Sequence, residues 1–266
     1  MNIDNLFRLD NKVVILTGGS GLIGKEVMIN LSLFGAKVVV GVRDIIKFEK
    51  QLGLLQLPKK CKMPVYYCLD ISDETSVIEF FHKTINNFGK IDILINNAWP
   101  RTSDWGVKFE EIKIESLYKN LCDHAGGYFL CCQKVANYMK KQQEGVILNM
   151  GSIYGTVGPN FPMYKNTDMT CPAAYSLIKG GIHTFTKYLA TYLAPYNIRV
   201  NCLAPGGISD NTRQEPGFVK SYNKRTPLGR MGKPEDIIGS TIFLVSDASR
   251  YVTGEVLVVD GGWTAW

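Results

Sequence analysis

The sequence predicts an α/β fold, in which one doubly wound domain has a central parallel sheet of about seven strands and helices on both faces. Three observations carry this prediction. Short β-branched runs alternate with longer helical patterns, which is the order of a parallel sheet covered by helices. A glycine-rich stretch separates the first such run from the first helix. The length of 266 residues suits one domain over residues 1–266 and is short for two.

The first half of the chain contains four runs that are apolar and rich in β-branched or aromatic residues, as buried strands are. These predicted strands lie at residues 13–16, 37–42, 65–69 and 91–95. A helix is predicted at 22–33, directly after the first strand. A second helix is predicted with Ser72 as its N-cap, with Asp73 and Glu74 in its first turn, and with its end near Gly89.

The second half of the chain continues the alternation of strands and helices. Strands are predicted at 146–149, 198–202 and 255–259, and helices at 173–193 and 234–245. Two segments, 155–172 and 206–230, do not fit this alternation and are interpreted as loops. Ligands of doubly wound sheets bind outside the carboxyl ends of the strands, and both segments follow strands. We therefore expect both segments to border a substrate site.

Composition excludes several classes of function. The net charge is +6, but Lys and Arg are scattered, so we expect no nucleic-acid partner and only a mild preference for an anionic small substrate. No apolar run approaches the roughly 20 residues of a membrane span, and the first residues lack a signal-peptide pattern. The seven Cys and three His have no metal-ligand spacing. A cytoplasmic protein with reduced thiols and no metal is expected.

The glycine-rich stretch is a candidate phosphate loop. It follows the first predicted strand, and glycines there allow a tight turn and bring backbone N–H groups close to a pyrophosphate. This arrangement is typical of a Rossmann-type dinucleotide site. The candidate cofactor-binding residues in the loop are Thr17, Gly18, Ser20, Gly21, Leu22, Ile23 and Gly24.

The end of the second predicted strand bears on the choice between NAD and NADP. An acidic residue there would bind the ribose 2′-hydroxyl of NAD, whereas an Arg would suit the 2′-phosphate of NADP. The chain has Val42 at the expected acidic position, followed by Arg43 and Asp44. We therefore favour NADP(H) with NAD(H) as the alternative, since Arg43 could stack on adenine with either cofactor and Asp44 could turn inward.

Three polar residues form a candidate catalytic set. Tyr175 and Lys179 are four residues apart in a predicted helix and share one face of it. The ammonium should lower the pKa of the phenol and suit Tyr175 to general acid/base work. Ser152 follows the predicted strand at 146–149 and could stabilise charge on a substrate oxygen.

The order of these motifs resembles the short-chain dehydrogenase/reductase family over residues 8–263. Asn96-Asn97-Ala98 and Pro205-Gly206 complete the resemblance. The family implies hydride transfer, with Lys179 also holding the nicotinamide ribose. The further cofactor-binding residues that the resemblance implies are Asp70, Ile71, Asn97, Ala98, Pro205, Gly206 and Ile208.

The chain departs from the family pattern at several positions. Trp99 stands where the family's Asn-Asn-Ala motif continues with Gly. The stretch between Ser152 and Tyr175 is longer than in the family and is expected to be a substrate loop. The family's proton-relay Asn aligns with His124, while Asn120 lies one helical turn earlier. His124 is therefore a catalytic candidate that holds a relay water or contacts substrate, with Asn120 or a purely structural histidine as alternatives.

Within the family, the region from Ser152 to Gly181 resembles oxidoreductases of bacterial flagellin and surface-glycan sugar pathways, of the flagellin modification protein A type. This resemblance implies an anionic sugar, either a sugar phosphate or a nucleotide sugar, as substrate. An indole can stack on a sugar ring, and cations can bind a phosphate or carboxylate. The candidate substrate-binding residues are Trp99, Arg101, Lys165 and Arg213.

The sequence therefore predicts an NAD(P)-dependent oxidoreductase for a carbonyl/alcohol pair on such a sugar. A non-catalytic dinucleotide-binding regulator and a reductase of apolar carbonyls are the alternatives. The family also implies a homotetramer or homodimer, paired through helices around residues 120–142 and 173–193. Ile182, Phe185 and Leu189 form an apolar stripe that either makes this contact or faces the chain's own sheet.

Overall fold

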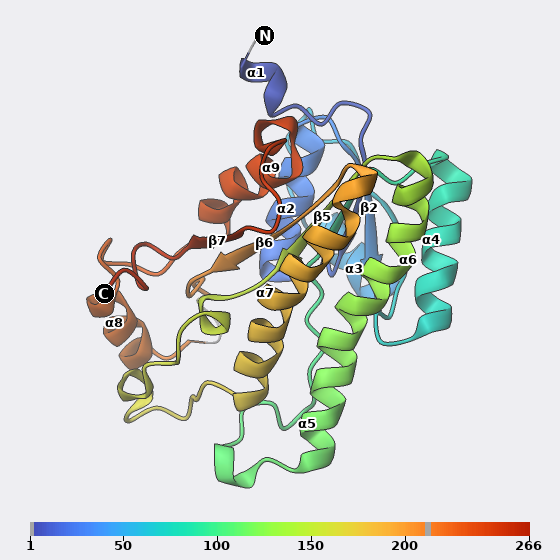
Figure 1. The fold of residues 1–266 in the computed structure, drawn as a ribbon. Helices are drawn as coiled ribbons and strands as arrows, with labels where there is room; N and C mark the ends of the chain where they lie inside the picture. Colours follow the sequence, from blue (N-terminus) through green and yellow to red (C-terminus); the bar gives the residue numbers. More distant parts are fainter. Residues whose placement is uncertain (1–2, 211–213) are drawn as a thin grey trace.

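A computed structural model describes residues 3–210 and 214–266. In these residues seven parallel strands form one sheet, as the sequence predicts (Figure 1). The strand order is β3-β2-β1-β4-β5-β6-β7. The strands are β1 Val13–Thr17, β2 Lys37–Val42, β3 Val65–Cys68, β4 Ile93–Asn96, β5 Gly145–Met150, β6 Ile198–Pro205 and β7 Val256–Val259. The order reverses between β1 and β4, which is where doubly wound sheets bind their ligands.

The register brings the carboxyl ends of the central strands together. Asn96 at the end of β4 pairs with Asn149 of β5, and Asn149 pairs with Cys202 of β6. The Asn96 side chain also donates a hydrogen bond of 3.0 Å to the Asn149 side chain. Loops after these strands therefore start from one edge of the sheet.

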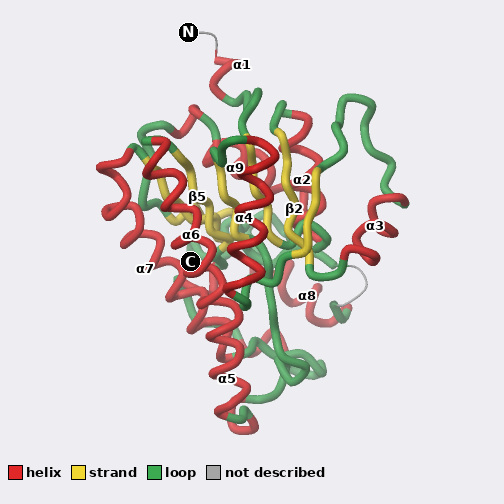
Figure 2. Tube along the Cα trace, turned by 90° about the vertical axis from the view of Figure 1, so that its right-hand side faces the viewer, coloured by secondary structure: helices red, strands yellow, loops and turns green. Residues whose placement is uncertain are grey.

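Helices cover both faces of the sheet (Figure 2). Buried residues of α4, α6 and α7 pack against one face, and those of α2, α3 and α9 pack against the other. The α-helices are α1 Ile3–Leu6, α2 Leu22–Leu33, α3 Ile45–Gly53, α4 Glu74–Phe88, α5 Ile114–Asn120, α6 Gly127–Gln142, α7 Ala173–Leu193, α8 Pro216–Arg225 and α9 Ile238–Val245. Within the described ranges, no helix combines the length and apolar character needed to cross a lipid bilayer.

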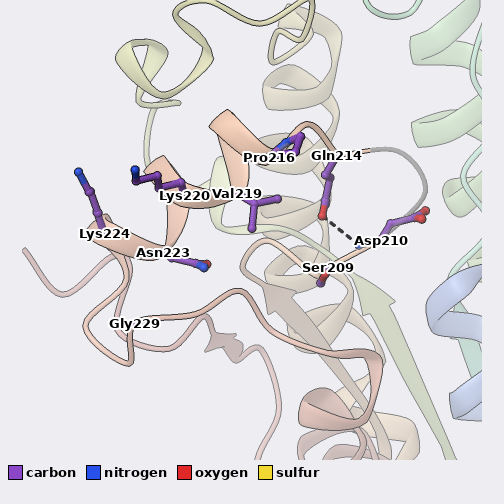
Figure 3. Close-up of a pocket in the computed structure, with 9 residues that line it drawn as sticks. All are labelled: Ser209, Asp210, Gln214, Pro216, Val219, Lys220, Asn223, Lys224 and Gly229. Atoms are coloured by element: carbon purple, nitrogen blue, oxygen red, sulfur yellow. Dashed lines mark hydrogen bonds between the residues drawn. The ribbon is translucent and has the colours of Figure 1, made fainter.

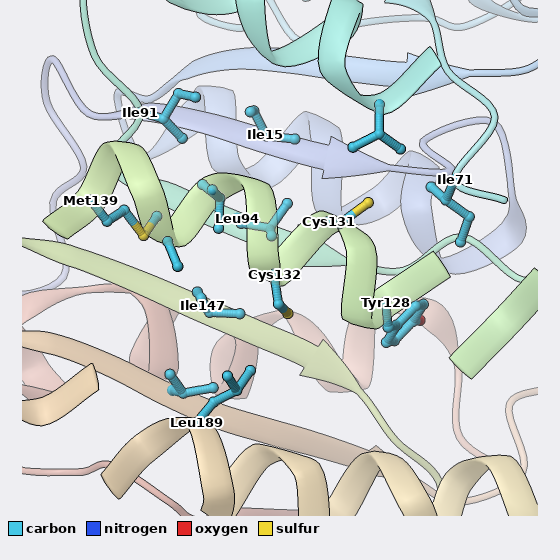
Figure 4. Close-up of a cluster of buried hydrophobic side chains, with 14 of the residues drawn as sticks. Ile15, Ile71, Ile91, Leu94, Tyr128, Cys131, Cys132, Met139, Ile147 and Leu189 are labelled. Atoms are coloured by element: carbon cyan, nitrogen blue, oxygen red, sulfur yellow. The ribbon is translucent and has the colours of Figure 1, made fainter. Parts of the chain in front are cut away.

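The strands supply both hydrophobic cores because their side chains alternate between the faces. Along β1, Val13 and Ile15 join one core, while Val14 and Leu16 join the other. All four side chains are fully buried. Figure 4 shows the first core, in which Cys132 of α6 lies beside strand residues such as Leu94 and Ile147.

The N-cap predicted for the helix after β3 is wrong by one residue. Asp73, not Ser72, caps α4, and its carboxylate accepts a hydrogen bond of 2.9 Å from the Thr75 amide. The Ser72 hydroxyl instead donates to the Asp70 carboxylate at 2.6 Å. The predicted end is confirmed, since Gly89 ends α4 with a φ of 74°, a left-handed conformation that favours glycine.

The prediction of a loop at 206–230 is wrong for the part that forms α8. Tertiary contacts stabilise this helix, whose Phe218 and Tyr222 pack in a third hydrophobic cluster with Met163 of the segment 155–172. That segment, here called the insert, has no α-helix or strand, as predicted. A short 3-10 turn, Ile153–Gly155, leads into it, and a second, Phe161–Tyr164, lies within it. The helix predicted at 234–245 begins as a 3-10 turn, Pro234–Ile237, before α9.

Candidate active site

The glycine-rich loop is tied to the end of β4 by backbone and side-chain hydrogen bonds. The Thr17 hydroxyl accepts from the Asn97 and Ala98 amides at 2.9 and 3.0 Å. The Asn97 side chain donates to the carbonyls of Thr17 and Gly18, each at 3.0 Å. Gly18 has a φ of 71°, and a Cβ there would lie 2.8 Å from Ala98 Cα, so only glycine fits. Thr17 and Asn97 thus hold the loop in its conformation through these hydrogen bonds.

The same loop ends at the N-terminus of α2. Its N-cap, Gly21, makes no side-chain capping bond, so the first amides of the helix remain available to an anion. Ser20 and Leu22 are exposed beside these amides, and Ile23 is half-buried. Gly24 packs directly on the Gly18 carbonyl and the Gly19 backbone. This cradle fits the diphosphate of a dinucleotide.

The residues at the end of β2 lie where the adenosine of a dinucleotide is expected, and they include one cation, Arg43. Val42 is buried, whereas Arg43 is exposed. Burial acts to raise the pKa of the nearby Asp70 carboxyl, but hydrogen bonds from Ser72 and, to a smaller extent, the charge of Arg43 lower it below its usual value. Asp44 does not turn inward, because its carboxylate caps α3 by accepting from the Lys47 amide at 2.8 Å. Ile71, the neighbour of Asp70, is buried in the core against α6 rather than exposed.

The structure brings the three predicted catalytic residues together at the carboxyl end of β5. Ser152 follows this strand and is buried. Its hydroxyl lies close enough to the Tyr175 phenol to act on the pKa of that group. Tyr175 and Lys179 lie one turn apart in α7, and the Lys179 ammonium is 5.6 Å from the centre of the Tyr175 ring. Lys179 also donates to the Met150 carbonyl at 2.6 Å.

Burial dominates the titration of this set. It raises the pKa of the Tyr175 phenol to about 12, although the hydrogen bond with Ser152 acts in the opposite direction. It lowers the pKa of Lys179 to about 8, because a buried ammonium loses its hydration. The expectation that Lys179 lowers the phenol pKa is therefore wrong for this arrangement. Tyr175 is a protonated donor at neutral pH.

His124, rather than Asn120, lies beside the catalytic lysine. Its Nε2 is 3.4 Å from Lys179 Nζ, and the imidazole is fully buried. Burial and the neighbouring ammonium hold the pKa of His124 well below its usual value. Its Nδ1 has no hydrogen-bond partner among the described residues. The Asn120 amide is engaged elsewhere, with Thr102 and Ser116.

A π-helical segment, Leu121–Gly126, carries His124 between α5 and α6. The wider helical turn displaces the side chains that follow from ordinary α-helical positions, and such segments frequently occur at functional sites. It could not be recognised from hydrophobic spacing. The segment aims the imidazole at α7, so His124 contacts Lys179 directly.

The chain after β6 forms the next wall of the site. Gly206 packs on Asp260 and Tyr222, and Ile208 bridges to Gly232. The Ile208 carbonyl also accepts a hydrogen bond of 2.9 Å from the Gln214 side chain. Pro205 is the last residue of β6, so the three residues predicted to lead to nicotinamide, Pro205, Gly206 and Ile208, lie at the sheet edge beside the other strand ends.

A pocket of about 650 Å³ opens beside this wall (Figure 3). Lys220 and Lys224 of α8 line it on one side, with Ser209 and Asp210 on the other. The volume is within the usual range for small-molecule sites. Both lysines were missed from the sequence because α8 was not predicted. Residues four apart in a helix lie on the same face, which brings Lys220 and Lys224 together.

The structure brings two of the four predicted substrate residues, Trp99 and Arg101, together. Trp99 and Arg101 follow β4, with the Arg101 guanidinium 4.7 Å from the centre of the Trp99 ring, and Trp99 lies 5.6 Å from the Tyr175 ring. Lys165 is exposed in a turn of the insert, and no described hydrogen bond or ion pair joins it to Arg101. Arg213 lies outside the described residues. Sequence analysis missed Trp105, whose ring is 6.1 Å from that of Tyr175.

Comparisons with known proteins agree with this arrangement. A family model described as enoyl-(acyl carrier protein) reductase matches residues 20–264. The chain is 36% identical over 257 residues to post-translational flagellin modification protein A of Campylobacter coli, covering 96% of this chain and 99% of that protein. It is also 36% identical over 262 residues to a 3-oxoacyl-[acyl-carrier-protein] reductase of Thermotoga maritima, with 96% and 98% covered.

Solved structures share the fold over the whole chain. A short chain dehydrogenase from Leptospira borgpetersenii with bound NAD+ has a TM-score of 0.85 at 36% identity, covering 99% of this chain and 96% of that one. A gluconate 5-dehydrogenase from Burkholderia cenocepacia in complex with NADP and tartrate has a TM-score of 0.85 at 26% identity, with full coverage of both chains.

Proposed function

The chain belongs to the short-chain dehydrogenase/reductase family, and on that basis we propose that it moves a hydride between NADP(H) and a carbonyl/alcohol pair of an anionic sugar. The observation that carries the proposal is the convergence of Ser152, Tyr175 and Lys179 at the sheet edge beside the phosphate cradle. The complete set argues against a non-catalytic regulator. Turnover of NADPH with a panel of keto-sugar phosphates and nucleotide-linked keto sugars tests the proposal.

The side chains of the protein are assigned two tasks, which are to transfer a proton and to orient the substrate and the cofactor. When bound, the dinucleotide supplies or accepts the hydride. In reduction, the Tyr175 hydroxyl donates its proton to the substrate oxygen, and the Ser152 hydroxyl stabilises charge on that oxygen. Lys179, anchored on the Met150 carbonyl, would hold the nicotinamide ribose. In oxidation, Tyr175 must first lose its proton to act as the base.

We assign His124 to positioning Lys179 rather than to contact with substrate. The neutral imidazole can accept a hydrogen bond from the Lys179 ammonium through Nε2, at 3.4 Å. This contact needs no intervening water, and it stabilises the charged lysine in an interior that otherwise disfavours it. The chain thus replaces the family's relay Asn by an imidazole that acts through the catalytic lysine.

An anionic sugar as substrate is supported by one relative and by the placement of cations. The relative from Campylobacter coli is named a flagellin modification protein. In this chain, the Arg101 guanidinium lies one aromatic ring away from Tyr175, since both contact Trp99. Lys220 and Lys224 line the neighbouring pocket. These side chains provide donors for a phosphate or carboxylate at the mouth of the site.

Replacing Arg101 by Ala should raise KM about tenfold for an anionic sugar and leave kcat nearly unchanged. The guanidinium is remote from the reacting bond and should bind ground and transition states equally. The KM of the wild type should also rise with ionic strength. Steady-state kinetics at two salt concentrations measures both effects.

Lys165→Ala is the companion variant, since Lys165 is the other predicted substrate cation that the structure describes and is exposed in the insert. We expect a smaller rise in KM from it than from Arg101→Ala. An unchanged KM in both variants, for every phosphorylated or carboxylated sugar, would rule out the anionic-substrate part of the proposal.

A ketone on an acyl chain is the second candidate substrate. The relative from Thermotoga maritima, named a 3-oxoacyl-[acyl-carrier-protein] reductase, is as similar in identity as the flagellin relative. The two candidates differ in how they would use the site, because the Arg101 guanidinium would strengthen the binding of an anionic sugar but not that of an acyl chain. Including acetoacetyl thioesters in the substrate panel distinguishes the two.

The preference for NADP(H) is supported by Arg43, the exposed cation at the end of β2, and by the engagement of Asp44 as a helix cap. We expect NADP to bind at least tenfold tighter than NAD, because a guanidinium can bind the 2′-phosphate through charge-assisted hydrogen bonds. Arg43→Ala should reduce the difference between the NADP and NAD affinities, and Arg43→Lys should reduce it less. Calorimetry with both cofactors measures the affinities, and equal wild-type affinities would contradict the preference.

The assembly proposed for this enzyme is a homodimer or homotetramer. The apolar stripe of Ile182, Phe185 and Leu189 cannot make this contact, because Ile182 and Leu189 are buried in the chain's own core. A row of aromatic rings on α6 and α7 replaces it, in which Phe129, Tyr188 and Tyr192 are exposed. The half-buried Phe185 lies between Phe129 and Tyr188, and the successive ring separations along the row are 5.7, 6.4 and 6.0 Å. Exposed apolar patches of this kind mark contact surfaces.

Light scattering at micromolar concentration should give a multiple of the 29.7 kDa monomer mass. Tyr188→Glu should shift the mass toward the monomer, because a carboxylate would be buried unpaired in the contact. The equally radical Tyr251→Glu, at a fully exposed tyrosine outside the row, is the control and should not change the mass. A monomeric wild type would remove this part of the proposal.

In the described structure all seven cysteines are free thiols. Free thiols suit a reducing compartment, and the proposal places the enzyme in the cytoplasm.

A further inference from the structure

The ring of Tyr175 is enclosed by two indoles. Trp105 meets it edge-on, with centroids 6.1 Å apart and an interplanar angle of 88°. Trp99 lies 5.6 Å from it at 47°, and the two indoles are 5.8 Å apart. Trp99 is 45% exposed, so part of its ring surface remains open to a ligand.

The loop that carries Trp105 is held in place from α5. The Thr102 amide donates to the Asn120 side chain at 3.1 Å, and the Ser116 hydroxyl donates to the Asp104 carboxylate at 2.7 Å. Trp105 itself is half-buried and packs against the main core. The indole therefore keeps its place relative to Tyr175 and forms a fixed part of the site.

A buried hydroxyl belongs to Tyr154, whose backbone amide donates to the Ser152 hydroxyl at 3.2 Å. Burial raises the pKa of Tyr154 well above its ordinary value, and the neighbouring Tyr164 hydroxyl acts in the same direction as a weak hydrogen-bond partner. Within the described residues, the Tyr154 hydroxyl forms no hydrogen bond of standard geometry. Buried hydroxyls are normally satisfied, so an unsatisfied one beside a reacting group indicates a position for a ligand hydroxyl.

We propose that the reacting carbonyl is a ring carbon of a cyclic, hydroxylated substrate, packed by its C–H face on Trp99 and Trp105 and hydrogen-bonded by a ring hydroxyl to Tyr154. This inference rests on the proposed function and deepens it. In reduction, the hydride that bound NADPH would supply forms a C–H bond at the ring carbon as the C=O π bond breaks, and the oxygen takes the proton of Tyr175. A secondary alcohol forms, and Tyr175 is left as a phenolate that must regain a proton.

The geometry favours a ring over an open chain for a physical reason. The substrate oxygen must reach the Tyr175 hydroxyl, and both indoles contact the ring that bears this hydroxyl. The atoms bonded to the carbonyl carbon then lie near an indole surface. A ring offers a flat, preorganised C–H face of similar size, whereas a flexible chain loses conformational entropy to cover the same area.

The experiment compares an inosose, a cyclic polyhydroxy ketone, with erythrulose, an acyclic one, at saturating NADPH. The wild type should prefer the inosose by at least tenfold in kcat/KM. Trp105→Ala should reduce this preference about tenfold, the effect of one aromatic contact, while Trp105→Phe should retain most of it. Tyr154→Phe should lower kcat/KM for the inosose more than for erythrulose.

Trp266→Ala is the matched control. It removes an exposed indole whose ring nitrogen donates to the Arg225 carbonyl and which is not among the residues that line the neighbouring pocket, so it should leave the preference unchanged. A wild type that prefers erythrulose, or a Trp105→Ala variant that loses both activities equally, overturns the inference alone. Reduction of neither ketone, nor of any sugar in the panel, overturns the proposed function and this inference with it.

Discussion

Tyr175→Phe is expected to lower the rate of hydride transfer by about 10² or more, because it removes the proton donor and keeps the ring. The packing of Trp99 and Trp105 on that ring should persist, since neither contact involves the hydroxyl. Cofactor affinity should change little. Single-turnover kinetics measures the loss, and dinucleotide titration provides the control. A near-normal kcat in the variant would remove Tyr175 from the mechanism.

The pH dependence of the two directions should differ. Burial holds the pKa of Tyr175 at about 12, so the phenol is protonated at neutral pH and ready to donate in carbonyl reduction. Alcohol oxidation needs the phenolate, whose fraction rises about tenfold per pH unit below the pKa. The kcat/KM for oxidation should therefore rise from about pH 6 to about pH 7.5, while that for reduction stays flat over this range, in which Lys179, with a pKa of about 8, keeps most of its charge. Tyr175→Phe should abolish the rise.

Gly24→Ala is expected to be the most damaging change in the phosphate cradle. A Cβ at this position would collide with the Gly18 carbonyl and the Gly19 backbone, neither of which can rotate away. Overpacking of this kind costs about 1–3 kcal/mol and would displace the loop. We expect the melting temperature to fall and cofactor affinity to drop at least tenfold, as measured by thermal unfolding and calorimetry.

Gly21→Ala is the control for this prediction. Gly21 has an ordinary φ of −76°, and a Cβ there would meet only the Gly18 carbonyl, at 3.6 Å. Its melting temperature should match that of the wild type. If Gly24→Ala bound cofactor and melted like Gly21→Ala, close packing of the cradle would not be the reason for the glycine.

Much of the fold could be predicted because its signals are local. Alternating apolar runs identified the strands, and Gly89 marked the end of a helix through its own backbone preference. The glycine loop, Ser152, Tyr175 and Lys179 were recognisable because short spacing within one element, or directly after a strand, determines their placement.

What the sequence by itself determined, then, is the parallel sheet, the phosphate cradle and the catalytic set. Only the tertiary structure decided the rest. It formed α8 by packing Phe218 against the insert, aimed His124 at Lys179 through a π-helical turn, and brought Trp105 to Tyr175 across about 70 residues of sequence. The physical reason is that these contacts join separate elements. Their free energy depends on burial and on how helices pack against one another, which no periodicity within a single segment records.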